Sequence, residues 1–417
     1  MRSKLLLAAI GLGLAGCGEG KAPAATVAEP AFASTWYLAD GAAPQIAVNI
    51  HDTALGKAGF VRDAQGDLLP IRNVVVTDTD MSFVVPDAEA TWRATRGADG
   101  AWTGIWAAGS AAPEYTLRDT PAPDLDADFV VFEDGRWNAF TCAGAGSPAV
   151  ILDYGAGGSM GVWKDVFGPI SHVTRTCMFE RAGRGLSDPG RMPRDVNTAV
   201  ADIDAFIAAA KIEGPVVLVG HSMASYHVRQ FANLHKDGDV AGIVLVDPSG
   251  DGQTARFLAA IPNFAELAPE KINEDAVSRC AAALRERLAP RGNPVAAKCN
   301  GNDPDRVEAT LSEIAAMEVV STGQLVAARR PYGDLPMIVL TRGDYEKGMP
   351  PEFTAQSRVA MAKVWTEMHA EMAAQSNIGE TRVVAGAGHF IQGDKPQAVI
   401  DAVSEVVTKA RARSQGK

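Results

Sequence analysis

Residues 216–225 read VVLVGHSMAS, a run of four apolar residues followed by a serine between small neighbours. Four apolar, mostly β-branched residues in a row predict a buried strand. A serine in the pattern G-x-S-x-small lies at a sharp turn from a strand into a helix, where larger flanking side chains would clash with both elements. Gly220 and Ala224 provide the small flanks. The stretch therefore predicts that Ser222 is exposed as a nucleophile.

Strand-like and helix-like segments alternate on both sides of this turn. Fully apolar strands that alternate with helices indicate a buried, mostly parallel sheet. An amphipathic pattern predicts a helix at 197–212, and Asp134-Gly135 predicts a hairpin between 128–133 and 137–142. Besides 216–219, apolar runs predict strands at 149–153, 174–179, 243–246, 337–341 and 382–384.

This part of the chain resembles the α/β-hydrolase superfamily from about residue 128 to 411. The resemblance implies an α/β-hydrolase fold, with a mostly parallel sheet flanked by helices and a helical cap inserted after the sixth strand, at about 249–335. Within the cap, helices are expected at 255–261, 275–288 and 305–326. Besides the serine turn, four segments carry the resemblance in the superfamily's order: 153–159 (DYGAGGS), 180–188 (ERAGRGLSD), 244–248 (VLVDP) and 386–390 (GAGHF).

A serine needs a base to take its proton at neutral pH. Of the seven histidines, only His389 lies in a glycine-rich loop after the last predicted strand, and the resemblance makes it the catalytic base. We expect His369 to be a surface residue of an amphipathic helix. The third member of the predicted triad is an acid that fixes the imidazole tautomer. We favour Asp247, which ends the strand after the serine helix, and Asp344 is the alternative.

Acyl transfer through a serine also needs N–H donors aimed at the developing oxyanion. The resemblance implies the backbone N–H of Met223 and that of Ala156, or of Gly157, in the glycine-rich loop. The expected function is a serine hydrolase that cleaves carboxylic esters through an acyl-serine intermediate. Amide, peptide or lactone hydrolysis by the same residues, and a non-catalytic ligand-binding lipoprotein, remain alternatives. No metal or cofactor is expected.

The first 16 residues have the composition of an export signal. Arg2 and Lys4 precede an apolar run at 5–14, which is too short to span a bilayer. The run ends in Leu-Ala-Gly before Cys17 and resembles the bacterial lipobox. It predicts a signal peptide at 1–16, lipidation of Cys17 and a tether at 17–33. The protein is then expected in the cell envelope, anchored through lipid at the outer membrane or the periplasmic face.

Residues 34–120 predict a small antiparallel β domain ahead of the main domain at 124–417. Short β-type runs alternate with turn signals and show no helical period. The segment loosely resembles the lipocalin-like β modules that precede some secreted serine hydrolases. Strands are expected at 46–50, 71–77, 81–85, 91–95 and 102–106. Four tryptophans are expected to fill the core of this domain: Trp36, Trp92, Trp102 and Trp106.

The charge balance limits the class of partner. The chain has 39 Lys and Arg against 50 Asp and Glu, a net charge of −11 without a basic block, so binding to nucleic-acid phosphates is not expected. The expected partners are a small ester-type substrate and a membrane, through Cys17; the oligomeric state is left open.

Besides Cys17 there are four cysteines, Cys142, Cys177, Cys280 and Cys299, which allow three pairings. Export would permit disulfides. The sheet order implied by the resemblance pairs Cys142 with Cys177. Cys280 and Cys299 are then expected to form a local pair within the cap.

Overall fold

The computed structural model describes residues 34–38, 47–63, 67–119, 128–235, 238–261, 303–348 and 352–415, together with residues 264 and 282. The predicted signal peptide, the tether with Cys17, the helix at 275–288 and the Cys280–Cys299 pair lie outside this part and stay predictions. No helix in the described part is both long and apolar enough to cross a membrane.

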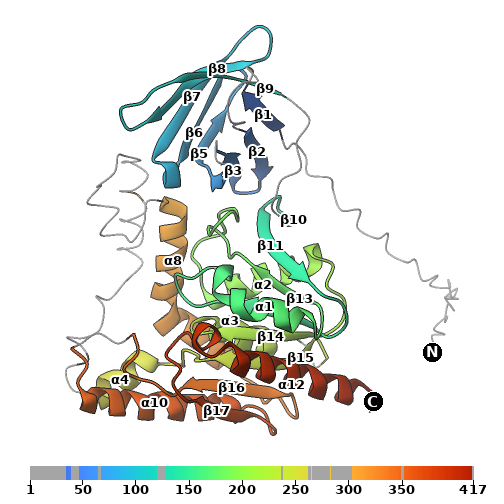
Figure 1. Ribbon diagram of the computed structural model, residues 1–417, viewed down its shortest axis with the longest axis vertical. Helices are drawn as coiled ribbons and strands as arrows, with labels where there is room; N and C mark the ends of the chain where they lie inside the picture. Colours follow the sequence, from blue (N-terminus) through green and yellow to red (C-terminus); the bar gives the residue numbers. More distant parts are fainter. Residues whose placement is uncertain are drawn as a thin grey trace, which may run out of the picture.

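The N-terminal part forms one antiparallel sheet of nine strands in the order β4-β3-β2-β1-β9-β8-β7-β6-β5 (Figure 1). Strands near its two ends approach each other, and the N–H of Ile71 donates to the carbonyl of Gly59. The strands are β1 (Ser34–Leu38), β2 (Ala47–Thr53), β3 (Gly56–Arg62), β4 (Leu68–Pro70), β5 (Arg72–Val76), β6 (Asp80–Val85), β7 (Ala90–Arg96), β8 (Trp102–Ala108) and β9 (Glu114–Asp119), with the short helix η1 (Pro86–Ala88) after β6.

Trp92 and Trp102 are buried in the core of this sheet, and Trp106 packs against them. The side chain of Trp36 lies outside the described residues. The core is therefore formed in part by the expected tryptophans.

The remaining chain is organised around an eight-stranded sheet in the order β10-β11-β13-β12-β14-β15-β16-β17. The hairpin of β10 and β11 is antiparallel, β11 is antiparallel to β13, and all later neighbours are parallel. The strands are β10 (Asp128–Val131), β11 (Trp137–Ala143), β12 (Ala149–Asp153), β13 (Thr176–Phe179), β14 (Val216–His221), β15 (Val240–Val246), β16 (Met337–Arg342) and β17 (Glu380–Val384).

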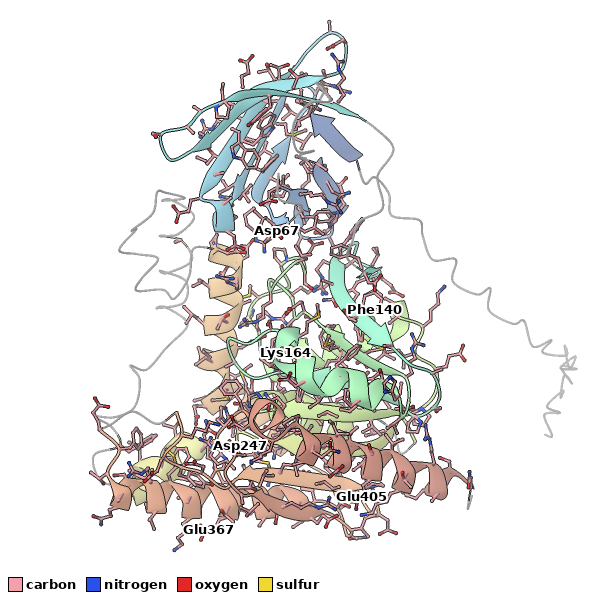
Figure 2. All side chains as sticks on the ribbon, viewed as in Figure 1. Asp67, Phe140, Lys164, Asp247, Glu367 and Glu405 are labelled. Atoms are coloured by element: carbon pink, nitrogen blue, oxygen red, sulfur yellow. A yellow bond between two sulfur atoms is a disulfide. The ribbon has the colours of Figure 1, made fainter. Side chains whose placement is uncertain are left out.

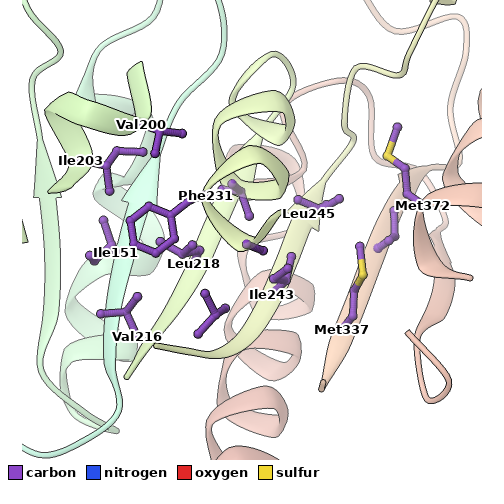
Figure 3. Packing of buried hydrophobic residues seen from close by; sticks show 14 of the residues in the cluster. Ile151, Val200, Ile203, Val216, Leu218, Phe231, Ile243, Leu245, Met337 and Met372 are labelled. Carbon is purple, nitrogen blue, oxygen red and sulfur yellow. The ribbon is translucent and has the colours of Figure 1, made fainter. Parts of the chain in front are cut away.

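Both faces of this sheet are covered, which explains why its strands are apolar without alternation. On one face, Leu218 and Ile243 pack against Phe231 and other residues of helices α2, α3 and α10 (Figure 3). On the other face, Val217 packs with residues of α1, α11 and α12. These helices are α1 (Lys164–Ser171), α2 (Val196–Ala209), α3 (Ala224–Leu234), α10 (Ala355–Ala373), α11 (Ile391–Asp394) and α12 (Pro396–Gln415), and η2 (Met160–Trp163) precedes α1.

The chain between β15 and β16 contains α4 (Gln253–Ala260), α8 (Pro304–Ala316), the π-helix η3 (Met317–Ser321) and α9 (Thr322–Ala328). The single helix expected at 305–326 is therefore interrupted by one wider turn. The hydroxyl of Thr322 donates to the carbonyl of Met317 at 2.8 Å. This side-chain bond to a carbonyl five residues earlier matches the wider π spacing.

A disulfide joins Cys142 to Cys177, with the two Cα atoms 4.1 Å apart. The two residues lie opposite each other in the register of β11 and β13. The expected sheet order and this expected pairing are thus both present in the structure.

We expect the double variant Cys142→Ser, Cys177→Ser to be less stable than the oxidised protein by about 3 kcal/mol, because the disulfide closes a 35-residue loop in the unfolded chain. Urea unfolding followed by circular dichroism measures the difference. Reducing agent should lower the stability of the wild type and leave the double variant unchanged. Equal stability of the oxidised wild type and the variant would contradict the prediction.

Candidate active site

Ser222 occupies the sharp turn between β14 and α3. Its φ is +55°, a left-handed conformation that non-glycine residues rarely adopt. The turn is held because the N–H of Ser222 donates to the carbonyl of Val246 at 3.0 Å. A Cβ at Gly220 would lie 2.8 Å from the carbonyl oxygen of Ala224, so the expected steric reason for the small flank is present.

Three predicted side chains meet at this turn, each from the carboxyl end of a different strand. The hydroxyl of Ser222 lies 2.9 Å from Nε2 of His389, and Nδ1 of His389 lies 2.6 Å from a carboxylate oxygen of Asp247. His389 belongs to the loop between β17 and α11, and Asp247 directly follows β15. Parallel strands bring their carboxyl ends to one edge of the sheet. His389 therefore contacts Ser222, which lies 167 positions earlier in the chain, and Asp247, which lies 142 positions earlier.

The carboxylate of Asp247 is fully buried in the eight-stranded part of the molecule (Figure 2). It accepts hydrogen bonds from the backbone N–H of Arg342 at 3.0 Å, from Nε of Arg342 at 2.7 Å and from the indole N–H of Trp365 at 2.8 Å. Burial alone would raise the pKa of Asp247. The hydrogen bond from His389 and the charge of Arg342 outweigh burial and lower that pKa to about 2, so the group is a carboxylate at neutral pH.

Asp344, the alternative acid, is turned toward its own loop. Its carboxylate accepts from the N–H groups of Glu346 at 2.8 Å and Lys347 at 3.0 Å, and these bonds lower its pKa. The N–H of Asp344 donates to the carbonyl of Ala387, so this residue supports the loop that carries His389. Within the described structure, the acid that contacts His389 is Asp247.

Two residues that the sequence analysis did not single out also contact His389. A guanidinium nitrogen of Arg342 lies 3.0 Å from Nδ1 of His389. Arginine only donates, so Nδ1 cannot bond it while donating to Asp247, and the shorter bond to the carboxylate is favoured. Nε2 of His221 donates to the backbone carbonyl of His389 at 2.9 Å, and burial lowers the pKa of His221 to about 3. The only sequence signal for His221 is its position next to Ser222.

The glycine-rich loop passes directly over Ser222. A Cβ placed on Gly155 would lie 2.9 Å from the Cβ of Ser222 and 3.3 Å from its hydroxyl oxygen. Ala156 and Gly157 are the next residues, and Gly157 has a φ of +71°. Met223 follows Ser222 directly at the start of α3. The predicted oxyanion donors therefore lie on the two backbone segments that meet at Ser222.

Buried side chains from the segment 180–188 hold this loop. Arg181 donates to the carbonyls of Tyr154 and Gly155 and, at 2.7 Å, to the carboxylate of Asp153. The hydroxyl of Tyr154 donates to Glu180 at 2.8 Å, and burial raises the pKa of Glu180. The motif at 180–188 was recognised in the sequence, but its contacts to the loop were not.

The structure corrects the expectation that His369 is a surface residue. The side chain of His369 is fully buried, because α10 packs against β16 and α4. Its Nε2 donates to the carbonyl of Pro248 at 2.9 Å and its Nδ1 accepts from the hydroxyl of Thr341 at 2.6 Å. Burial lowers the pKa of His369 to about 4, so it is neutral at pH 7.

Residues 155–402 match the Alpha/beta hydrolase family. The probable transporter efuK of Hormonema carpetanum is 22% identical over 280 residues, which are 64% of this chain and 40% of that protein, so the match spans less than half of that relative. The uncharacterized protein YqjL of Bacillus subtilis is 22% identical over 264 residues, 63% of this chain and 85% of that protein. A solved thermophilic esterase of Thermogutta terrifontis is 20% identical, with a TM-score of 0.44, over 68% of this chain and 99% of its own.

Because His221 and His369 are buried in their neutral form, we expect the protein to lose stability in mild acid. Below pH 6.5 the unfolded chain binds protons at His221 and His369, whereas the folded chain does not until about pH 4 for His369 and about pH 3 for His221. The free energy of unfolding therefore falls with decreasing pH, by about 1.4 kcal/mol per pH unit for each histidine.

We expect His369→Gln to reduce the slope of unfolding free energy against pH by about 1.4 kcal/mol per unit between about pH 6 and about pH 4.5. Urea unfolding at a series of pH values measures it. His172 is exposed, and His172→Gln should keep the wild-type slope. A wild-type slope in His369→Gln would contradict the assignment of a buried neutral histidine.

Proposed function

Since the chain belongs to the alpha/beta hydrolase family, we propose that it is a hydrolase that cleaves carboxylic ester bonds with Ser222, His389 and Asp247. The observation that carries the proposal is the continuous line of hydrogen bonds from the hydroxyl of Ser222 through both ring nitrogens of His389 to the carboxylate of Asp247. A serine within 2.9 Å of a base that is itself oriented by a buried acid is the arrangement that activates a hydroxyl for attack on an acyl carbon.

In the proposed reaction, the oxygen of Ser222 attacks the carbonyl carbon of the ester while Nε2 of His389 takes the hydroxyl proton. Asp247 remains ionised and stabilises the imidazolium. The negative oxygen of the tetrahedral intermediate accepts hydrogen bonds from the N–H groups of Met223 and Ala156. His389 then gives its proton to the leaving alkoxide, and an alcohol departs from the acyl-serine.

The second half of the reaction repeats these steps with water. His389 takes a proton from a water molecule as the water oxygen attacks the acyl carbon. The ester bond to Ser222 then breaks, and His389 returns the proton to the serine oxygen. The products are a carboxylic acid and the free enzyme.

The nucleophile separates this chemistry from other reactions of the same fold. Hydrolysis of epoxides or haloalkanes on this fold needs a carboxylate nucleophile, whereas this turn carries Ser222. Amides, peptides and lactones react through the same acyl-serine. Esters are favoured over amides and peptides because an alkoxide leaves with less help from the general acid than an amine does. Lactones are cyclic esters and belong to the proposed substrate class.

We also propose, from residues 1–17 alone, that the enzyme is exported and anchored through lipid on Cys17 in the cell envelope. Basic residues, a short apolar run and small residues before a cysteine support this part of the proposal.

We expect a burst of p-nitrophenol, equal in amount to the enzyme, when the protein is mixed with p-nitrophenyl butyrate, because acylation of Ser222 precedes slower deacylation. Ser222→Ala should abolish the burst and lower kcat by about 10⁴-fold or more. The matched control is Ser225→Ala, which should keep the burst. Ser225 is a buried serine in the first turn of α3, and its hydroxyl donates to the carbonyl of Ser249. Persistence of the burst in Ser222→Ala would refute the acyl-serine mechanism.

Asp247→Asn should lower kcat by about 10⁴-fold, because the amide cannot hold the imidazole in the productive tautomer or stabilise its charge. The same change leaves Arg342 without its buried counter-charge and should cost about 3 kcal/mol of stability. Asp344→Asn is the matched control and should keep kcat within about 3-fold. The kcat of both variants is measured on protein that circular dichroism shows to be folded. A low kcat in Asp344→Asn together with a near-normal kcat in Asp247→Asn would assign the acid to Asp344.

A further inference from the structure

Helix α8 runs from the nine-stranded sheet to the level of the eight-stranded sheet (Figure 1). Its N-cap is Asp303, whose carboxylate accepts from the N–H groups of Asp305 at 3.0 Å and Arg306 at 3.3 Å. Glu313 lies ten positions after Asp303, a rise of about 15 Å along a helix. The two residues are therefore positioned to connect distant parts of the molecule.

The N-terminal end of α8 is held by the nine-stranded sheet. Arg72, the first residue of β5, donates to both carboxylate oxygens of Asp303, at 3.1 and 2.9 Å, and forms a further ion pair with Asp305 at 3.1 Å. The side chains of Arg72 and Asp303 are only 2% and 3% exposed. A buried, bidentate pair of this kind fixes direction as well as distance.

The C-terminal half of α8 holds the glycine-rich loop through the segment 180–188. Glu313 accepts from Nε and a terminal nitrogen of Arg181, both at 3.1 Å. The same terminal nitrogen of Arg181 donates to the carbonyl of Gly155 at 3.1 Å. One turn earlier, Thr310 accepts from Arg184, which also donates to the carbonyl of Gly158 at 2.9 Å.

The nine-stranded sheet also holds the segment 180–188 directly. Nε2 of His51 donates to the carboxylate of Asp188 at 2.6 Å, and both side chains are buried. The ring of His51 stacks on Trp137 at 4.4 Å between centroids. The segment that carries Arg181 is thus attached to the nine-stranded sheet at one end and to α8 at the other.

The carbonyl of Gly155 and the N–H of Ala156 belong to one planar peptide unit. Fixing the oxygen of that unit therefore fixes the direction of its N–H. We propose that Arg72 is a positioning residue, which acts through Asp303, α8, Glu313 and Arg181 to aim the N–H of Ala156 at the oxyanion. The inference rests on the proposed function of Ala156 as an oxyanion donor and assigns the nine-stranded sheet a part in catalysis.

A gain in stability does not by itself explain why Arg72 and Asp303 form a buried ion pair. Removing two charges from water costs about as much as their attraction returns, and apolar residues of similar volume often stabilise equally well. What an ion pair adds is a fixed direction between the parts that it joins. The contacts at both ends of α8 are of this directional kind, which fits a role in orienting the loop.

The kinetic test compares Arg72→Met with the wild type on p-nitrophenyl butyrate. Oxyanion donors act mainly in the transition state, so kcat should fall by about 10-fold while KM stays within about 2-fold. Arg118→Met is the matched control, since Arg118 forms an exposed ion pair with Asp99 on the same sheet, and it should change neither constant. Unchanged kcat in folded Arg72→Met, or an effect confined to the melting temperature, would overturn the proposal.

Hydrogen exchange tests the same inference without activity. In Arg72→Met the backbone amides of residues 156–159 should exchange faster than in the wild type and in Arg118→Met; wild-type exchange would overturn the proposal. If the wild type neither turns over esters nor reacts with a fluorophosphonate, the proposed function fails, and exchange still decides whether Arg72 orders the loop.

Milder variants cover the case in which Arg72→Met does not fold. Asp303→Asn keeps a good N-cap and removes the bidentate one of the two carboxylates that pair with Arg72, leaving Asp305 in place. Glu313→Gln breaks the chain of contacts at its other end. Each should lower kcat with little change in KM and speed the exchange of residues 156–159. In the double variant the two effects should be less than additive, because both act through one helix. Fully additive effects on kcat in the double variant would count against a connection through α8. Unchanged kcat and unchanged exchange in both single variants would also count against it.

Discussion

The buried carboxylate of Asp247 is the group around which the site is built. A charge removed from water must be surrounded by donors, and here four N–H groups converge on it, two from Arg342, one from Trp365 and one from His389. These donors come from the end of β16, from α10 and from the loop after β17. The need to satisfy one charge therefore determines how three separate segments pack at the carboxyl edge of the sheet, and it leaves Nε2 of His389 facing Ser222.

Buried charges organise the backbone on the other side of Ser222 in the same way. Arg181 is buried between Asp153 and Glu313, and the donors that remain hold the carbonyls of the glycine-rich loop. The coulombic attraction of Arg181, together with His227, lowers the pKa of Asp153 to about 2 despite the opposing effect of burial. Both backbone segments next to Ser222 thus depend on ionised groups inside the protein, and Arg72 extends this arrangement into the nine-stranded sheet.

Local pattern predicted the α/β part of the chain well. The family match supports the α/β-hydrolase fold that the motifs implied, and the strand expected at 149–153 has those bounds in the structure. The nine-stranded sheet was predicted less completely. Strand β3 contains Gly56 and Gly59, and β4 has only three residues and ends in Pro70. Such segments have little β propensity and form strands because their neighbours in the sheet pair with them.

The sequence by itself singled out Ser222, because the sharp turn that it predicts requires small flanking residues. It singled out His389 because that residue lies in a glycine-rich loop after the last strand, and the order of the motifs indicated the family. It left Asp247 and Asp344 open, since both acids follow strands that end at the same edge. Only the tertiary structure separates them: Asp247 lies among donors from β16, α10 and His389, whereas Asp344 accepts from its own loop. Arg72 and Asp303 are 231 positions apart, and no local pattern encodes a contact that exists only when two sheets and a helix have packed together.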